Sequence, residues 1–269
     1  LDRNLRESDM SELMRLDRDG SVGILRFLQT AKRNPYSIAF VDALIDCLRE
    51  ADQDDSIRAV VMTGGEQFSS GGDLVGFQDE VAKGARATSE MIDRVHDGGR
   101  AAYQFRKPLI SAVRGVAFGA GLSLALSADI VVAAEDARLC EVFARVGGCP
   151  DTGSSWLLQQ RAGAGVARML VLTGREIDGR TARELNVVED CVPADEVEAR
   201  ALEIAREIAA HPMFGVQSAK RVMRSAAESS YLEALDIERD AQTVLLAAHD
   251  FPEAMRAFSQ KRKPEFQDR

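Results

Sequence analysis

Residues 109–126 read LISAVRGVAFGAGLSLAL, and this stretch decides the class of fold. The mostly apolar residues 109–113 predict a buried strand, since short apolar runs bounded by turn residues are typical of parallel sheets. A glycine-rich loop follows at 115–121 and leads directly into a helix of small and apolar residues. A strand that opens through glycines into a helix is the repeating unit of α/β folds.

The same order is found on both sides of this stretch. An apolar strand at 57–63 leads to another glycine-rich loop, FSSGGDL at 68–74. A strand at 129–134 precedes a third loop, GGCPDTG at 147–153, and a helix that contains Trp156. The order recurs at intervals of roughly 50 residues without any repeat of the residues themselves. The sequence therefore predicts an α/β body.

Weaker patterns come before this body and within it. Residues 21–28 alternate loosely and predict a strand, and Ser37 is a suitable N-cap for a helix running to Leu48. A further helix is expected over 88–106, interrupted at its Gly-Gly pair, 98–99.

Beyond Pro193 no segment predicts a strand. Apolar residues at helical spacing predict three or four helices, broken at Pro212, around Ser229 and at Pro252. The chain is thus divided into an N-terminal extension, an α/β core and a helical C-terminal region, at 1–20, 21–194 and 195–269.

Composition excludes several classes of protein. The 269 residues are 45% hydrophobic and 29% charged, which excludes collagen-like and disordered chains. The formal net charge of −9 argues against nucleic-acid and anionic-membrane partners, since both need clustered Lys and Arg. The apolar runs are too short for a membrane helix, and the charged start does not resemble a signal peptide. A cytoplasmic protein is expected.

Cysteines and histidines give no sign of a metal site. The four cysteines are scattered without a CxxC pair, and we expect them to be reduced thiols. His96, His211 and His249 are isolated from one another and match no metal-ligand spacing. We therefore expect no metal cofactor.

The glycine loops at 68–74 and 115–121 point to chemistry carried by the main chain. Glycines after a buried strand allow N–H groups to face a cleft, and the first N–H groups of a helix lack internal acceptors. Two such loops brought together would present two donors to one oxygen, which is the requirement of an oxyanion hole.

Four motifs, in order, resemble those of the crotonase family, also called the enoyl-CoA hydratase/isomerase family. The loop FSSGGDL resembles the family's F-x-(A/S)-G-x-D-(L/I), and residues 115–130 resemble its G-x-(A/C)-x-G-(A/G)-G run ending in D-I. The third loop matches G-x-x-P-x-x-G, and FSQKRKPEF at 258–266 matches F-x-x-K-R-x-P-x-F. The resemblance extends from about residue 20 to 266.

This resemblance implies a crotonase-like spiral of ββα units with a C-terminal helical trimerisation region. It also implies a homotrimer or a hexamer (a dimer of trimers), an acyl-CoA substrate, and no cofactor beyond the CoA moiety. The family's two oxyanion donors correspond to the backbone N–H groups of Gly72 and Ala120. Residues matching the family's CoA contacts, the last two from a neighbouring subunit, are Arg33, Ser70, Gly71, Asp73, Leu74, Phe258 and Lys261.

The departures from the family pattern bear on the reaction. Hydratases of the family use two glutamates, and this chain has Ser123 and Phe143 at those positions. A hydroxyl is a poor acid or base near neutral pH, and a phenyl ring cannot move a proton. One carboxylate remains, Asp151, at a position where isomerases and dehalogenases of the family carry an aspartate. Glu141 matches no catalytic position.

A single acid/base group suits isomerisation, because it can remove a proton at one carbon and return it at another. Phe143 next to Asp151 would raise the pKa of that carboxyl group by desolvation. The resemblance therefore favours a double-bond or ring isomerase in which Asp151 is the acid/base group.

Other interpretations are kept open. Asp151 has an alternative role as a turn or helix-cap residue. One alternative function is that of a hydratase, thioester hydrolase or decarboxylase with atypical catalytic groups. Another is that of a non-catalytic acyl-CoA-binding homologue. A nicotinamide-dependent oxidoreductase is disfavoured, because five residues separate Val113 from Gly119 and Leu124 occupies the third glycine position of the dinucleotide fingerprint.

Overall fold

A six-stranded sheet forms the centre of the computed structural model, which describes residues 12–268. Its strand order is β1-β2-β3-β4-β6-β9. β1 pairs with β2 in the antiparallel sense, and all the other neighbours are parallel. The strands are β1 Met14–Asp19, β2 Val22–Phe27, β3 Ala59–Thr63, β4 Leu109–Val113, β6 Ile130–Ala134 and β9 Asp190–Val192.

Every residue of β3 and β4 is buried, as expected where both faces of a parallel sheet are covered. α8 packs against β3 and β4, whereas α2 packs against α4 and β1. The helices of the body are α2 Ile38–Gln53, α3 Gln78–Ala82, α4 Ala85–Gln104, α5 Ala120–Leu126, α6 Ser154–Thr173, α7 Gly179–Glu184 and α8 Val197–Ala209, with short 3₁₀ turns η1 Thr30–Lys32 and η2 Val142–Val146. The α/β body predicted from the sequence is confirmed.

A second, three-stranded sheet lies beside the glycine loops. It has the order β5-β7-β8, with β5 at Val116–Phe118, β7 at Arg138–Cys140 and β8 at Glu176–Asp178. β5 falls inside the loop expected at 115–121, and the sequence analysis missed it because three residues between glycines carry too little periodicity. β1 was missed as well, so residues 14–19 of the expected N-terminal extension form an edge strand.

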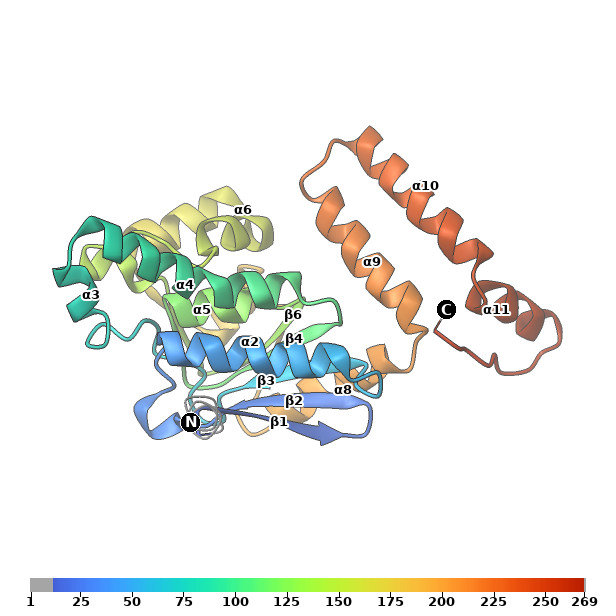
Figure 1. Cartoon of the computed structure of the whole chain (residues 1–269), viewed down its shortest axis with the longest axis horizontal. Helices are drawn as coiled ribbons and strands as arrows, with labels where there is room; N and C mark the ends of the chain where they lie inside the picture. The colour runs from blue at the N-terminus through green and yellow to red at the C-terminus, as the bar shows by residue number, and fades with distance from the viewer. Residues whose placement is uncertain (1–11, 269) are drawn as a thin grey trace.

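The C-terminal region is helical, as expected, and it extends away from the body as an arm (Figure 1). The arm consists of α9 Met213–Ala226, α10 Tyr231–Ala247 and α11 Asp250–Ser259. The breaks at Pro212 and around Ser229 are confirmed, and Ser230 begins α10 with a capping box to Glu233. The break expected at Pro252 is wrong, because this proline lies in the first turn of α11, where its missing N–H has no helical acceptor.

α4 also differs from the expectation, since it continues without interruption through Gly98 and Gly99. A Cβ at Gly98 would lie 2.2 Å from the hydroxyl oxygen of the buried Tyr36. A Cβ at Gly99 would lie 3.0 Å from Cγ2 of Thr152. The two glycines are therefore required by close packing and do not break the helix.

We expect Gly98→Ala to lower the free energy of unfolding by about 1–3 kcal/mol, because the added methyl group overpacks a site that cannot expand. Gly165→Ala in α6 is the matched control, since a Cβ there meets nothing within 4 Å. It should leave the stability unchanged or raise it by up to about 1 kcal/mol. Urea denaturation of both variants tests this; equal stability of the two would contradict the packing argument.

Candidate active site

Two of the glycine loops lie side by side. The N–H of Ser69 donates to the carbonyl of Val116 at 2.9 Å, and the N–H of Phe118 donates to the carbonyl of Ser69 at 3.1 Å. Gly71 has φ +86°, and a Cβ there would lie 2.5 Å from the carbonyl oxygen of Phe118. Only glycine allows this approach, and it brings the loops 68–74 and 115–121 together as the sequence suggested.

The backbone N–H groups that follow these contacts have no acceptor. Ala120 is the first residue of α5, and Gly119 before it has φ +48°. Within residues 12–268, the N–H groups of Gly72 and Ala120 donate to no group of the chain. A Cβ at Gly71 would lie 3.7 Å from the nitrogen of Ala120, which shows how close the two loops are. Two adjacent free donors can hold an oxygen on which negative charge develops.

Asp151 lies on the third loop, between η2 and α6, and is partly buried. The hydroxyl of Thr152 donates to its Oδ1 at 2.8 Å. The Ser123 hydroxyl lies 3.1 Å from the carbonyl oxygen of Gly119 and 3.2 Å from that of Asp151. Ser123 therefore joins the second loop to the third and places Asp151 near the start of α5.

Burial raises the pKa of Asp151, as the sequence analysis expected, while the hydrogen bond from Thr152 and the charge of His96 partly offset this rise. Phe143 lies beside the second glycine loop, since a Cβ at Gly119 would meet its Cζ at 3.4 Å. Thr152 itself has φ +53°, a conformation costing about 1–3 kcal/mol for a residue other than glycine. Such strain next to a buried carboxyl group is typical of functional sites.

Two residues near Asp151 were not predicted from the sequence. Tyr36 is fully buried and donates to the carbonyl of Val95 at 3.3 Å. Burial, followed by the charge of Asp151, raises the pKa of Tyr36. His96 lies on α4 with its Nε2 buried and unpartnered, and its charge lowers the pKa of Asp151. The sequence could have indicated His96 through its place next to Val95, Gly98 and Gly99, which are buried residues of α4.

Glu141 was noted in the sequence only for matching no catalytic position. It is 1% exposed, and neither carboxyl oxygen has a hydrogen-bond partner. Desolvation raises its pKa to about 7, with a further rise from the charge of Asp151. The Ser154 hydroxyl faces Glu141 and opposes this rise, although the geometry between them falls short of a hydrogen bond.

A cavity of about 420 Å³ adjoins the third loop. Tyr103 and Trp156 form part of its wall and contact each other edge to face, with ring centroids 5.6 Å apart. Its full lining is His96, Gly99, Arg100, Tyr103, Thr152, Gly153, Trp156, Leu157 and Glu228. Through Thr152 and Gly153, the cavity borders the loop that carries Asp151.

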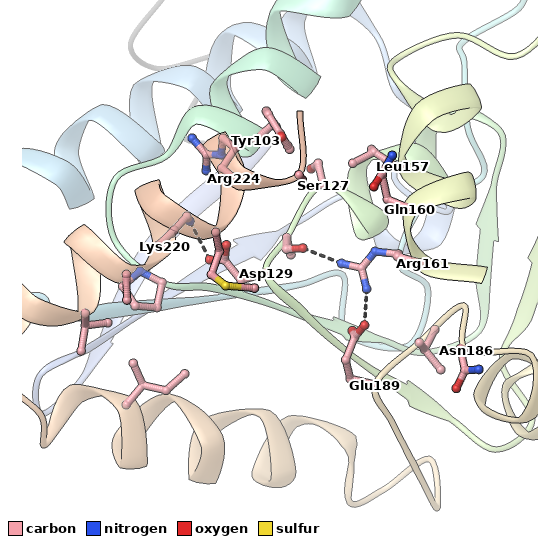
Figure 2. Close-up of a pocket in the computed structure, with 18 of the residues that line it drawn as sticks. Tyr103, Ser127, Asp129, Leu157, Gln160, Arg161, Asn186, Glu189, Lys220 and Arg224 are labelled. Carbon is pink, nitrogen blue, oxygen red and sulfur yellow. Dashed lines mark hydrogen bonds and ion pairs between the residues drawn. The ribbon is translucent and has the colours of Figure 1, made fainter. Parts of the chain in front are cut away.

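A larger cavity, about 880 Å³, lies between the body and α9 (Figure 2). Two ion pairs lie in its wall: Lys220 binds Asp129 at 2.6 Å, and Arg161 binds Glu189 at 2.5 Å. Neither Asp151 nor the two glycine loops line it. It therefore lies apart from the candidate active site, although both cavities share Tyr103, Trp156 and Leu157.

The residues expected to contact CoA fall into two groups. The first group gathers around the loop 68–74, where the N–H of Ser70 donates to the carbonyl of Arg33 at 2.7 Å. Asp73 accepts from the N–H of Gly76 at 3.0 Å, and Leu74 is exposed. Phe258 and Lys261 lie at the end of the arm, and α11 is on the opposite side of the molecule from α3 (Figure 1). One chain does not bring the two groups together.

Two kinds of feature are absent from the part of the chain that the structure describes. Over residues 12–268, no group of three or more His, Cys, Asp or Glu side chains is arranged to hold a metal ion. In the same part of the chain, no helix has the length and apolar character needed to cross a membrane.

Comparison with known proteins gives consistent matches. The family model described as enoyl-CoA hydratase/isomerase matches residues 17–269. The 1,2-epoxyphenylacetyl-CoA isomerase of Escherichia coli is 35% identical over 225 residues, covering 83% of this chain and 86% of that protein. The 2,3-dehydroadipyl-CoA hydratase of the same organism is 35% identical over 261 residues, covering 97% and 100%. An enoyl-CoA hydratase structure from Polaromonas sp. JS666 has a TM-score of 0.89 and 30% identity, covering 94% and 99%.

Proposed function

The chain belongs to the enoyl-CoA hydratase/isomerase family, and we propose that it is an isomerase that moves a double bond, or rearranges a ring, in an acyl-CoA thioester with Asp151 as its acid/base group. The observation that carries this proposal is the placement of the partly buried Asp151 beside two free backbone donors. The similarity to relatives does not decide the reaction, because an isomerase and a hydratase are both 35% identical to this chain.

The proposed reaction begins with the thioester carbonyl oxygen accepting hydrogen bonds from the N–H groups of Gly72 and Ala120. Asp151 then removes a proton from the carbon next to the carbonyl group, and the electron pair of the broken C–H bond delocalises onto the thioester oxygen. The two donors stabilise this charge, which is greater in the transition state than in the substrate. Asp151 returns the proton at the far end of the conjugated system, so the product has the same composition as the substrate.

Hydration is the weaker candidate because of what occupies the two glutamate positions of the hydratases. The Ser123 hydroxyl is fully buried against the carbonyl groups of Gly119 and Asp151, and it does not titrate near neutral pH. Phe143 has no group that could activate a water molecule. The cavity of about 420 Å³ next to Asp151 would take the acyl group, with Tyr103 and Trp156 suited to an apolar or aromatic one.

Mass spectrometry of the reaction products tests this proposal. A 3-enoyl-CoA should give a product of equal mass with a conjugated double bond, and a 2-enoyl-CoA should gain no water. Formation of a 3-hydroxyacyl-CoA, heavier by one water molecule, would instead establish a hydratase. No reaction with any ester, despite tight binding, would support a non-catalytic acyl-CoA-binding protein.

We further propose that the active site is completed across a subunit interface in a homotrimer or a dimer of trimers. Exposed apolar side chains are concentrated on the arm, which supports an interface there. They include Met223, Tyr231, Leu232, Met255 and Phe258. In this assembly Phe258 and Lys261 of one chain contact the nucleotide of the CoA bound by its neighbour through Arg33 and the loop 68–74.

We expect Lys261→Ala to raise KM for an acyl-CoA about tenfold with little change in kcat, because a charged hydrogen bond to phosphate is lost. The matched comparison is the same acyl group on pantetheine, which lacks the nucleotide and should show the same KM with both enzymes. An equal rise in KM for both thioesters would contradict a nucleotide contact.

A further inference from the structure

Lys261 lies just after the end of α11 and has a backbone conformation that is unusual for lysine. Its φ is +53°, in the left-handed region that favours glycine. The N–H of Lys261 donates to the carbonyl of Phe258 at 3.2 Å, and that of Arg262 donates to the carbonyl of Ala257 at 3.0 Å. These two bonds form a Schellman motif, in which glycine usually occupies the place of Lys261. Strain of this kind persists only where neighbouring contacts hold it, and it is concentrated at functional sites.

Glu253 of α11 holds the chain just beyond Lys261. The guanidinium of Arg262 donates to both carboxylate oxygens of Glu253, at 2.6 and 3.1 Å. The N–H of Glu265 donates to Oε1 at 3.0 Å, and Arg256 donates to Oε2 at 3.1 Å. These bonds, above all those from Arg262, lower the pKa of Glu253 to about 2, so the carboxylate is charged at neutral pH. Because Glu253 is only 5% exposed, loss of the bonds would leave a buried charge without partners.

Asp250, at the start of α11, holds the end of the chain in the same way. This buried carboxylate accepts from the N–H groups of Gln267 and Asp268, at 2.7 and 2.8 Å. The carboxylate of Asp268 in turn binds Arg58 at 2.5 Å and accepts from the N–H of Met213, the first residue of α9, at 2.6 Å. The chain therefore returns from α11 to the base of the arm (Figure 1). The segment after α11 is fixed at both of its ends.

The side chain of Lys261 takes no part in these contacts. It is exposed, and within residues 12–268 its ammonium group has no partner. An ammonium group is a compact point charge that suits a phosphate. A fixed backbone restricts the positions that this group can take, and a group that is already ordered loses less entropy when it binds.

We propose that Glu253 is a positioning residue for CoA: its bonds to Arg262 and Glu265 keep Lys261 in the left-handed conformation, which orients the ammonium group towards the phosphates of CoA. This inference rests on the proposed function for the contact between Lys261 and the nucleotide, whereas the bonds of Glu253 belong to the protein without ligand. Glu253 acts through Lys261 and not on CoA itself, so its replacement should weaken binding without abolishing it. The strain at Lys261 is then explained, because it orders a cation before the ligand arrives.

Calorimetric titration of the full chain with CoA tests the proposal without any turnover. Glu253→Gln preserves the shape of the side chain, but its NH₂ group faces donors in either orientation. We expect this variant to raise Kd for CoA by about three- to tenfold, which is the usual effect of having to order one long side chain on binding. In the Lys261→Ala background the same substitution should leave Kd unchanged, because the residue through which it acts is gone.

Glu265→Gln is the matched control. It makes the same change of charge in the same segment and keeps the backbone N–H from which Glu253 accepts. The Glu265 side chain is exposed, so Kd for CoA should stay within about twofold of the wild type. Circular dichroism of each variant checks that the arm remains helical.

An equal Kd in the wild type and Glu253→Gln would overturn the proposal, and so would an unchanged Kd in Lys261→Ala. A rise that is as large in the Lys261→Ala background as in the wild type would show a general loosening of the arm, which also overturns it. If Glu253→Gln does not fold, Arg262→Gln breaks the same contact from its exposed side and must give the same pattern. The expected binding pattern in a protein that isomerises no thioester would refute the proposed isomerase and leave the role of Glu253 intact.

Discussion

Asp151→Asn is expected to lower kcat for isomerisation by about 10²–10⁴-fold, the usual contribution of a positioned acid/base group. Asparagine has nearly the same shape, and its amide oxygen can still accept the hydrogen bond from Thr152. The amide cannot take a proton at neutral pH, so the chemical step should fail while the thioester still binds. Steady-state kinetics with a 3-enoyl-CoA should therefore show a large loss in kcat and little change in KM.

The control for this substitution is Asp136→Asn, which removes an exposed carboxyl group from the turn after β6. Its activity should stay within about twofold of the wild type, since exposed surface changes seldom affect structure. If Asp151→Asn loses no more activity than Asp136→Asn, Asp151 is a turn residue and not the acid/base group.

Ala120→Pro is expected to lower kcat/KM by at least about 10²–10³-fold, because proline removes one of the two oxyanion donors and its ring fills the place of the hydrogen. The helix itself should tolerate the change. Ala120 is the first residue of α5, a position where proline is common because the N–H has no helical acceptor. Circular dichroism and thermal unfolding should be close to those of the wild type.

Ala85→Pro is a closely matched control. Ala85 is the first residue of α4 and also follows a glycine with positive φ, Gly84 at +98°. It is exposed and lies in no part of the proposed site. We expect this variant to retain nearly full activity. Equal loss of activity in both proline variants would show that the effect is structural, and equal retention would mean that the Ala120 N–H does not hold the thioester oxygen.

The sequence predicted the fold where local patterns were strong. The apolar run at 109–113 and the cap at Ser37 correspond to β4 and α2 at nearly the expected bounds. Short elements such as β5 were missed, because three residues carry little periodicity. The pair Gly98 and Gly99 was misread because its cause is contact with Tyr36 and Thr152, which no local pattern reveals.

The candidate site was predictable only where a motif is continuous in the chain. The two glycine loops and Asp151 each lie within a recognisable run of residues, and the structure brings these runs together. Glu141 and His96 belong to no motif, and their proximity to Asp151 depends on how β7, α4 and α6 pack. Ser123 was noted in the sequence only for standing where the hydratases have a glutamate, and its link between two loops follows from the same packing.

The role of Asp151 in isomerisation is tested most directly by the ultraviolet absorbance of a 3-enoyl-CoA mixed with the wild-type protein and, separately, with Asp151→Asn. Conjugated thioester absorbance should grow with the wild type, and this growth should be almost abolished in the variant. A 2-enoyl-CoA should keep its conjugation. Loss of conjugation from the 2-enoyl-CoA, surviving in Asp151→Asn, would contradict isomerisation by Asp151 and show hydration by other groups.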